Sequence, residues 1–126
     1  MATKSEIQQT RELDRNEWAS FFEDLNRELE RGLDLEATIE LNTDQFVGPE
    51  VVRLPLAGIT YEDVKDEITV GVGGRGRRFP AVLWHFVAHP EKVWALEEQG
   101  ELRAIAIQSK DGTRTLVSLR PAPSAD

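Results

Sequence analysis

The most specific chemical pattern in the chain lies in residues 71–76, which read Gly-Val-Gly-Gly-Arg-Gly and match G-x-G-x-x-G. In dinucleotide-binding domains this pattern forms a tight turn, and the helix that follows meets a pyrophosphate with its N-terminus. Here Phe79 and Pro80 follow instead, ahead of an apolar, β-prone run. The nearest suitable acidic residue, Glu91, lies beyond a second predicted strand. The pattern therefore predicts a loop between two strands rather than a dinucleotide site.

The same loop retains the chemistry of an anion site. Backbone N–H groups of Gly73 and Gly74, beside the guanidinium groups of Arg75, Arg77 and Arg78, can hold a phosphate or a carboxylate. The alternative is a hairpin tip that the arginines only keep soluble. The loop is therefore a candidate for anion or small-molecule binding, and the sequence leaves both interpretations open.

His85 and His89 are the two histidines of the chain and have the spacing H-x-x-x-H. On a helix this spacing puts both imidazoles on one face, where they can bind zinc. The surrounding residues 83–90 alternate and are β-prone, and on a strand the two side chains stand ~13 Å apart. No metal site is therefore predicted. His85 with a nearby carboxylate is the pair that an enzyme of unrecognised type would use.

Trp84 and Trp94 lie in neighbouring predicted strands on either side of Pro90. If those strands pair, the two rings can meet. They then either pack in the core or, together with His85, line an aromatic pocket inside a curled sheet. Trp84, His85 and Trp94 are therefore a second candidate ligand site.

Signatures of covalent catalysis and of cofactor binding are missing from the chain. It has no cysteine, which excludes disulfides, thiolate metal sites and a cysteine nucleophile. It also has no nucleophile elbow, no Ser-x-x-Lys and no Gly-Lys-Ser/Thr of a P-loop. A non-catalytic role is therefore favoured over an enzyme, no catalytic residue is assigned, and no cofactor is expected.

The net charge of −8 is concentrated near the N-terminus. Residues 1–50 carry 13 Asp and Glu against five Lys and Arg, whereas residues 51–126 are balanced. Because an acidic chain repels phosphates, nucleic acid is a disfavoured partner, and only the arginine loop leaves it open. The N-terminus is too polar for a secretory signal, and no run approaches the ~20 apolar residues of a membrane span. A cytoplasmic protein without a membrane partner is expected.

A helix with complete end signals is predicted to begin at Asp14 and to end before Gly32. Asp14 and Glu17 form a capping box, and Leu13 and Trp18 form a hydrophobic staple. The apolar residues recur at helical spacing in one stripe, comprising Trp18, Phe21, Phe22, Leu25 and Leu29. This stripe is expected to cover a sheet rather than to bind a partner.

After the helix the apolar period changes to two, which predicts seven strands, at residues 33–41, 50–56, 67–72, 81–88, 92–97, 101–108 and 113–120. Ala57-Gly58 is interpreted as a turn, and Gly100 and Gly112 as parts of two-residue hairpin turns. The predicted fold is α+β, with the N-terminal amphipathic helix packed on a strongly twisted antiparallel sheet or small barrel of about seven strands.

The length corresponds to one domain, and we expect a single α+β domain over residues 13–120. Residues 1–12 are polar and without periodicity and are expected to form a flexible arm. Residues 121–126 are expected to form a disordered tail. No internal repeat or low-complexity segment divides the chain.

Several short stretches, taken in order, resemble a family of short bacterial single-domain proteins of unknown function. They are the W-x-x-F-F helix within 16–24, the L-P-L-x-G-I segment at 54–59, His85 followed by Pro90, and the D-G hairpin within 107–113. The resemblance covers about residues 14–120. It supports one domain over this range in a bacterial protein, and it implies no known activity, cofactor or site.

The sequence therefore predicts a small bacterial protein whose role is non-catalytic binding of a protein partner or a small ligand. Anion binding at the glycine–arginine loop and an enzyme based on His85 are the two alternatives. The identity of the partner and the oligomeric state stay open, a homodimer included.

Overall fold

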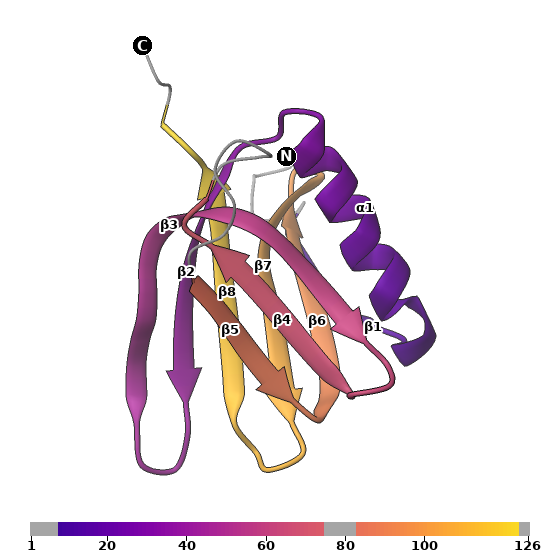
Figure 1. Cartoon of the computed structure of the whole chain (residues 1–126), viewed down its shortest axis with the longest axis vertical. Coiled ribbons are helices and arrows are strands. Elements are labelled where there is room, and N and C mark those ends of the chain that lie inside the picture. Colours follow the sequence, from indigo (N-terminus) through magenta and orange to yellow (C-terminus); the bar gives the residue numbers. More distant parts are fainter. Residues whose placement is uncertain (1–7, 75–82, 124–126) are drawn as a thin grey trace, which may run out of the picture.

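The chain folds into a helix and an antiparallel sheet (Figure 1). The computed structural model describes residues 8–74 and 83–123. Within these ranges the elements are β1 (Gln8–Leu13), the 3-10 turn η2 (Arg15–Glu17), α1 (Trp18–Glu30), β2 (Leu35–Asn42), β3 (Val47–Glu62), β4 (Glu67–Val72), β5 (Leu83–Ala88), β6 (Pro90–Glu98), β7 (Glu101–Ser109) and β8 (Arg114–Pro121). The combination of one helix with an antiparallel sheet agrees with the predicted α+β class.

The sheet folds over on itself because β3 is long enough to belong to both halves. The strand order is β1-β6-β7-β8-β2-β3-β4-β5. The first half of β3 pairs with β2, and its second half, from Leu56 to Glu62, pairs with β4. As a result β4 and β5 lie in front of β6, β7 and β8 (Figure 1). Buried side chains of both halves, such as Ile68 and Ile105, belong to one hydrophobic core.

The turn expected at Ala57-Gly58 is wrong, because β3 runs straight through these residues. The β3–β4 pairing shifts register between Leu56 and Gly58, so Ala57 is an extra residue on β3. Such a β-bulge bends a strand without ending it. Glycine inside a strand pattern is compatible with a turn or a bulge, and the local sequence does not distinguish the two.

The strand that the sequence did not predict is β1, which lies in the segment expected to be a flexible arm. Residues 8–13 pair with β6 at one end of the sheet. The side chains of residues 9–12 are exposed and only Leu13 is buried, so this strand lacks the apolar alternation by which strands are recognised. Among the described residues the sheet therefore has eight strands rather than seven. Residues 1–7 of the expected arm lie outside the described residues.

The sheet does not close into the small barrel that the sequence left as an option. In the described part of the chain, β1 and β5 end the strand order and do not pair with each other. Helix α1 packs against β3 and buries Trp18, Phe22 and Leu25, with Phe21 and Leu29 partly buried beside them. The expectation that the aromatic stripe covers the sheet is thus confirmed.

The signals that start and end the helix are present in the structure. The backbone N–H of Asp14 donates to Oε1 of Glu17 at 2.8 Å. Leu13 and Trp18 are both buried, and Nε1 of Trp18 donates to the carbonyl of Leu13 at 3.2 Å. At the other end Gly32 adopts a φ of +116°, a backbone conformation that favours glycine.

The side chain of Asn26 on α1 forms hydrogen bonds with the backbone of β3, on the edge that no longer pairs with β2. Nδ2 of Asn26 donates to the carbonyl of Ile59 at 2.8 Å, and the N–H of Ile59 donates to Oδ1 of Asn26 at 2.9 Å. The amide therefore occupies the place of a neighbouring strand. Gly58 permits the approach, since a Cβ at that position would lie 3.0 Å from Oδ1 of Asn26.

We expect Asn26→Ala to lower the free energy of unfolding by about 2–6 kcal/mol, because it leaves the N–H and the C=O of Ile59 without partners at roughly 1–3 kcal/mol each. The matched control is Asn16→Ala at an exposed position of η2, which should change that free energy by less than about 0.5 kcal/mol. Urea unfolding followed by circular dichroism measures both values. Equal losses in the two variants would contradict the assigned role of Asn26.

Candidate functional site

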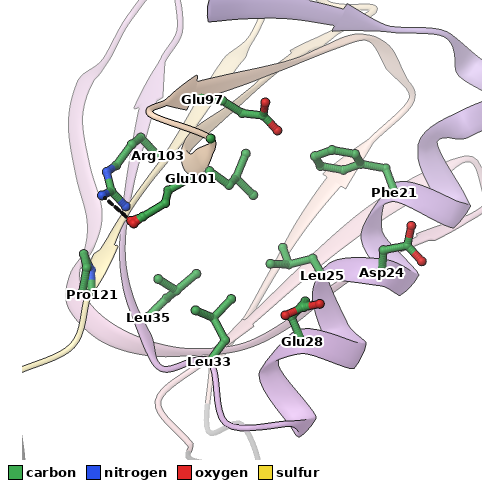
Figure 2. Close-up of a pocket in the computed structure, with 12 residues that line it drawn as sticks. Phe21, Asp24, Leu25, Glu28, Leu33, Leu35, Glu97, Glu101, Arg103 and Pro121 are labelled. Carbon is green, nitrogen blue, oxygen red and sulfur yellow. Dashed lines mark hydrogen bonds and ion pairs between the residues drawn. The ribbon is translucent and has the colours of Figure 1, made fainter. Parts of the chain in front are cut away.

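A groove of about 450 Å³ lies between α1 and the β6–β7 hairpin (Figure 2). Phe21 and Leu25 are one turn apart on the helix, Leu33 follows the end of the helix, and Leu102 comes from β7. The apolar floor comprises Phe21, Leu25, Leu33, Leu35, Leu102 and Pro121. The groove thus lies where residues 21–35, the β6–β7 hairpin and Pro121 at the end of β8 come together. Leu33 is 42% exposed there.

The rim of this groove is mainly acidic. Asp24 and Glu28 line it from the helix, and Glu97 and Glu101 line it from the hairpin, as Figure 2 shows. Arg103 is the single basic residue of the lining, and it pairs with Glu101 at 3.1 Å.

Two of the four rim carboxylates are left without an ion pair. Asp24 pairs with Arg27 at 2.9 Å, and Glu101 pairs with Arg103. Within residues 8–74 and 83–123, neither Glu28 nor Glu97 has an ion pair. The rim therefore presents uncompensated negative charge on both sides of an apolar floor.

The local sequence explains both walls of the groove. Gln99 and Gly100 have φ values of +56° and +79°, which is the predicted tight turn between β6 and β7. On the other side, the stop at Gly32 turns the chain so that Leu33 leaves the helix facing the groove. The sequence analysis placed Leu33 in the predicted strand 33–41, which is wrong, because β2 begins at Leu35 and Leu33 lies in the connection between α1 and β2.

The glycine–arginine loop is only partly described. Gly73 has a φ of +97°, and its N–H donates to the carbonyl of Pro55 at 2.8 Å, so that donor is already used within the protein. Gly74 is buried. The three arginines proposed for anion binding, Arg75, Arg77 and Arg78, lie outside the described residues. Anion binding at this loop stays a prediction.

The residues of the second predicted site, Trp84, His85 and Trp94, lie on two strands that do not pair with each other. Trp84 lies on β5 and Trp94 on β6, which are the last and the second strands of the sheet order, and the two rings make no contact. His85 is half-buried and has no hydrogen bond to a carboxylate among the described residues. Burial lowers the pKa of His85, and the charge of Glu50 opposes that shift. None of these three residues lines the groove between α1 and the β6–β7 hairpin.

A cluster of polar side chains that the sequence did not predict joins the start of the helix to two turns. The guanidinium group of Arg15 donates to Tyr61 Oη at 3.0 Å, to Asp66 Oδ1 at 3.1 Å and to the carbonyl of Pro90 at 2.8 Å. Tyr61 donates to Asp66 at 2.9 Å, and His89 Nδ1 lies 3.4 Å from the same carboxylate. We call this set the Arg15 cluster.

The backbone and the rings around the Arg15 cluster reinforce it. Asp66 and His89 have φ values of +51° and +50°, and the N–H of His89 donates to the carbonyl of Asp66 at 2.8 Å. The guanidinium group of Arg15 lies 4.6 Å from the ring centre of Trp18, whose ring meets Tyr61 edge to face at 5.1 Å. The contacts of the cluster therefore connect the β3–β4 turn and the β5–β6 corner to the start of α1.

The hydrogen bonds of the cluster keep Asp66 charged. Burial acts to raise the pKa of Asp66, but hydrogen bonds from Tyr61, Arg15 and His89 outweigh it and lower that pKa. Burial, together with the hydrogen bond to Asp66, raises the pKa of Tyr61. A carboxylate stabilised in its charged form by three donors is suited to holding structure rather than to exchanging protons.

The part of the chain that the structure describes holds neither a cluster of metal-binding side chains nor a membrane-spanning helix. No group of three or more histidine, aspartate or glutamate side chains there is arranged to hold a metal ion. Across the same residues, no helix is both long enough and apolar enough to cross a membrane.

Comparisons with known proteins support the resemblance read from the sequence. A model of a family described as "Family of unknown function (DUF5335)" matches residues 9–126. An "Uncharacterized protein" of Aquifex aeolicus (strain VF5) is 26% identical over 115 residues, which cover 90% of this chain and 94% of the relative. No solved structure matches the chain. The resemblance to a bacterial family of unknown function is thereby confirmed.

We expect Asp66→Asn to lower stability at pH 7 by about 1 kcal/mol, because it removes a charged hydrogen-bond acceptor that is partly exposed. A carboxyl group whose pKa is lowered by folding contributes stability above its unfolded pKa of about 3.9 and loses it as the pH falls through the folded value. The difference between the two proteins should therefore shrink below about pH 4. Thermal melts from neutral to acidic pH measure it.

The control for this experiment is Asp63→Asn in the same turn, where the side chain is exposed. It removes the same charge without touching the carboxylate that Arg15 and Tyr61 hold. A difference between wild type and Asp66→Asn that stays constant with pH would show that the charge of Asp66 does not stabilise the fold.

Proposed function

We propose that this chain, which belongs to the DUF5335 family of unknown function, is a non-catalytic binding protein of the bacterial cytoplasm. Its binding site is the groove between α1 and the β6–β7 hairpin. The occupant is a segment of a partner protein with an apolar face and lysine or arginine beside it. The observation that carries this proposal is the pairing of an apolar floor with an uncompensated acidic rim.

The floor supplies the affinity. The groove volume of about 450 Å³ falls within the range of pockets that bind ligands. Burying one leucine-sized side chain of a partner contributes roughly 1.5–3 kcal/mol. Leu33 is the exposed part of the floor and loses its own contact with water when the groove is filled.

The rim supplies the selectivity. Glu28 and Glu97 stand on opposite walls, so a cationic side chain of the occupant can pair with either carboxylate (Figure 2). The net charge of −8 adds a long-range field that raises the rate at which a basic partner arrives. An acidic partner meets repulsion from both sources.

A protein segment fits the groove better than a small molecule does. Small-molecule sites usually surround most of the surface of their ligand. This groove is open between the helix and the hairpin, with Leu33 in contact with solvent (Figure 2). An extended apolar stripe with charged edges is the complement of an amphipathic segment, which is recognised by regularly spaced apolar anchors.

A non-catalytic role is supported by how the ionisable groups are engaged. In the Arg15 cluster the carboxylate of Asp66 is occupied by Arg15 and Tyr61. The groove itself is lined by carboxylates and one arginine, with no histidine or hydroxyl group among its lining residues. These features of the Arg15 cluster and the groove therefore favour a binding role over a catalytic one.

The test measures the affinity of a labelled helical peptide built from leucine and lysine, with a leucine–glutamate peptide of the same pattern for comparison. Fluorescence anisotropy should show binding of the lysine peptide only. Glu28→Lys with Glu97→Lys should weaken it by at least about tenfold, which corresponds to ~1.4 kcal/mol. The matched control reverses two exposed carboxylates outside the groove, Glu40→Lys with Glu91→Lys, and changes the net charge equally.

The control separates a local site from general attraction to an acidic protein. If both double variants weaken binding equally, the groove is not the site. Leu33→Ala tests the apolar part separately and should weaken binding several-fold with little loss of stability, because Leu33 is partly exposed. Equal affinity for the lysine and glutamate peptides would overturn the proposed role of the rim.

A further inference from the structure

Carboxylates stand on both walls of the groove, and the apolar side chains lie between them (Figure 2). Asp24 and Glu28 belong to α1, whereas Glu97 and Glu101 belong to the β6–β7 hairpin. An occupant that satisfies both walls must therefore carry cationic side chains on both borders of its apolar face. Whether it can do so depends on its conformation, because helices and strands direct their side chains differently.

An extended segment does not meet this requirement. Successive side chains of a strand point to opposite faces, so a strand with its apolar face on the floor turns the intervening lysines toward solvent. The two edges of such a strand present backbone N–H and C=O groups to the walls instead of charged side chains. The rim carboxylates would then lie opposite the backbone rather than opposite the cations.

The groove also offers little backbone to an extended segment. In the described part of the sheet, β6 already lies between β1 and β7. The β7–β8 pairing reaches only to Ala104, so residues 101–103 have no partner in β8. Pro121, which lines the groove at the end of β8, has no N–H to donate. Strand addition depends on a row of main-chain hydrogen bonds, and this stretch is shorter than the usual strand of about 5–6 residues.

We propose that the occupant is an amphipathic α-helix of the partner protein, with lysine or arginine on both borders of its apolar stripe; this rests on the groove being the binding site proposed above. Successive residues of a helix turn by about 100°, so the positions beside the apolar stripe project sideways, toward the two walls. The backbone of a helix is satisfied internally and needs no strand edge. The four residues with which α1 lines the groove are spaced i, i+3, i+4 and i+7 and present one helical face to the occupant.

The wall formed by α1 sets the length and the spacing of the occupant. From Phe21 to Glu28 the helix rises about 10 Å, at ~1.5 Å per residue, which is two turns. Asp24 and Glu28 are one turn apart, so lysines at i and i+4 on the occupant repeat their spacing. A free segment of two or three turns is too short to be a stable helix in water. It therefore becomes helical as it binds, unless the partner holds it as a helix already.

Three labelled peptides of about 14 residues, or four helical turns, test this inference by fluorescence anisotropy. The first has leucines at helical spacing, lysines on both borders and alanines elsewhere. The second replaces a central, solvent-facing alanine with proline, which breaks the helix and keeps every leucine and lysine. The first should bind at least about tenfold more tightly than the second. Circular dichroism should show helix content that rises with the bound fraction of the first peptide.

The third peptide replaces the lysines of one border with glutamine and tests whether both walls are used. It should bind the wild type several-fold more weakly than the first peptide does. In Glu28→Gln or Glu97→Gln this difference should disappear, because one wall has then lost its unpaired carboxylate. The matched control is Glu40→Gln, at an exposed position outside the groove, where the difference should persist.

The outcomes separate this inference from the proposed function. Equal affinity for the first and the proline peptide, with binding that still depends on Glu28 and Glu97, overturns the helix and leaves the groove as the site. A preference for lysines on both borders that persists in both glutamine variants of the groove overturns the match of borders to walls. Failure of all three peptides to bind, or binding that ignores Glu28 and Glu97, overturns the proposed function itself.

Discussion

The fold depends on how the backbone of β3 is satisfied after it leaves β2. Beyond Leu56 this strand pairs with β4, and the N–H and C=O groups of Ile59 on its other edge would be left without partners. Asn26 provides both hydrogen bonds from α1, so the helix acts as the missing strand at this point. Unpaired backbone groups in a partly buried position are costly, and this cost fixes where the helix lies along β3. The Arg15 cluster fastens the start of the same helix to the two turns beside it.

The position of α1 in turn creates the groove. The helix packs against β3, and its residues Phe21 and Leu25 line the groove opposite the β6–β7 hairpin (Figure 2). The groove that results is apolar with an acidic rim.

The parts of the fold that were predictable are those whose cause is local in sequence. The capping residues Asp14 and Glu17, the stop at Gly32 and the glycine turn at Gly100 act on their immediate neighbours, and the structure confirms them. The strand β1 was missed because a polar end strand is stabilised by its partner β6 rather than by its own pattern. The turn assigned to Gly58 was wrong because the reason for that glycine, the approach of Asn26, lies 32 positions away. The groove and the Arg15 cluster were missed for the same reason, since each joins residues from three separate parts of the chain.

Recognition of a basic, apolar segment by the groove is best tested by mapping the amide chemical shifts of the isotopically labelled chain during titration with the leucine–lysine peptide. We expect the largest shifts at residues around Leu25, Leu33 and Leu102. These shifts should level off as the peptide concentration rises, and the affinity should fall as salt is added. Shifts that gather on β5 or spread evenly over the acidic surface, with the groove unchanged, would contradict recognition at the groove.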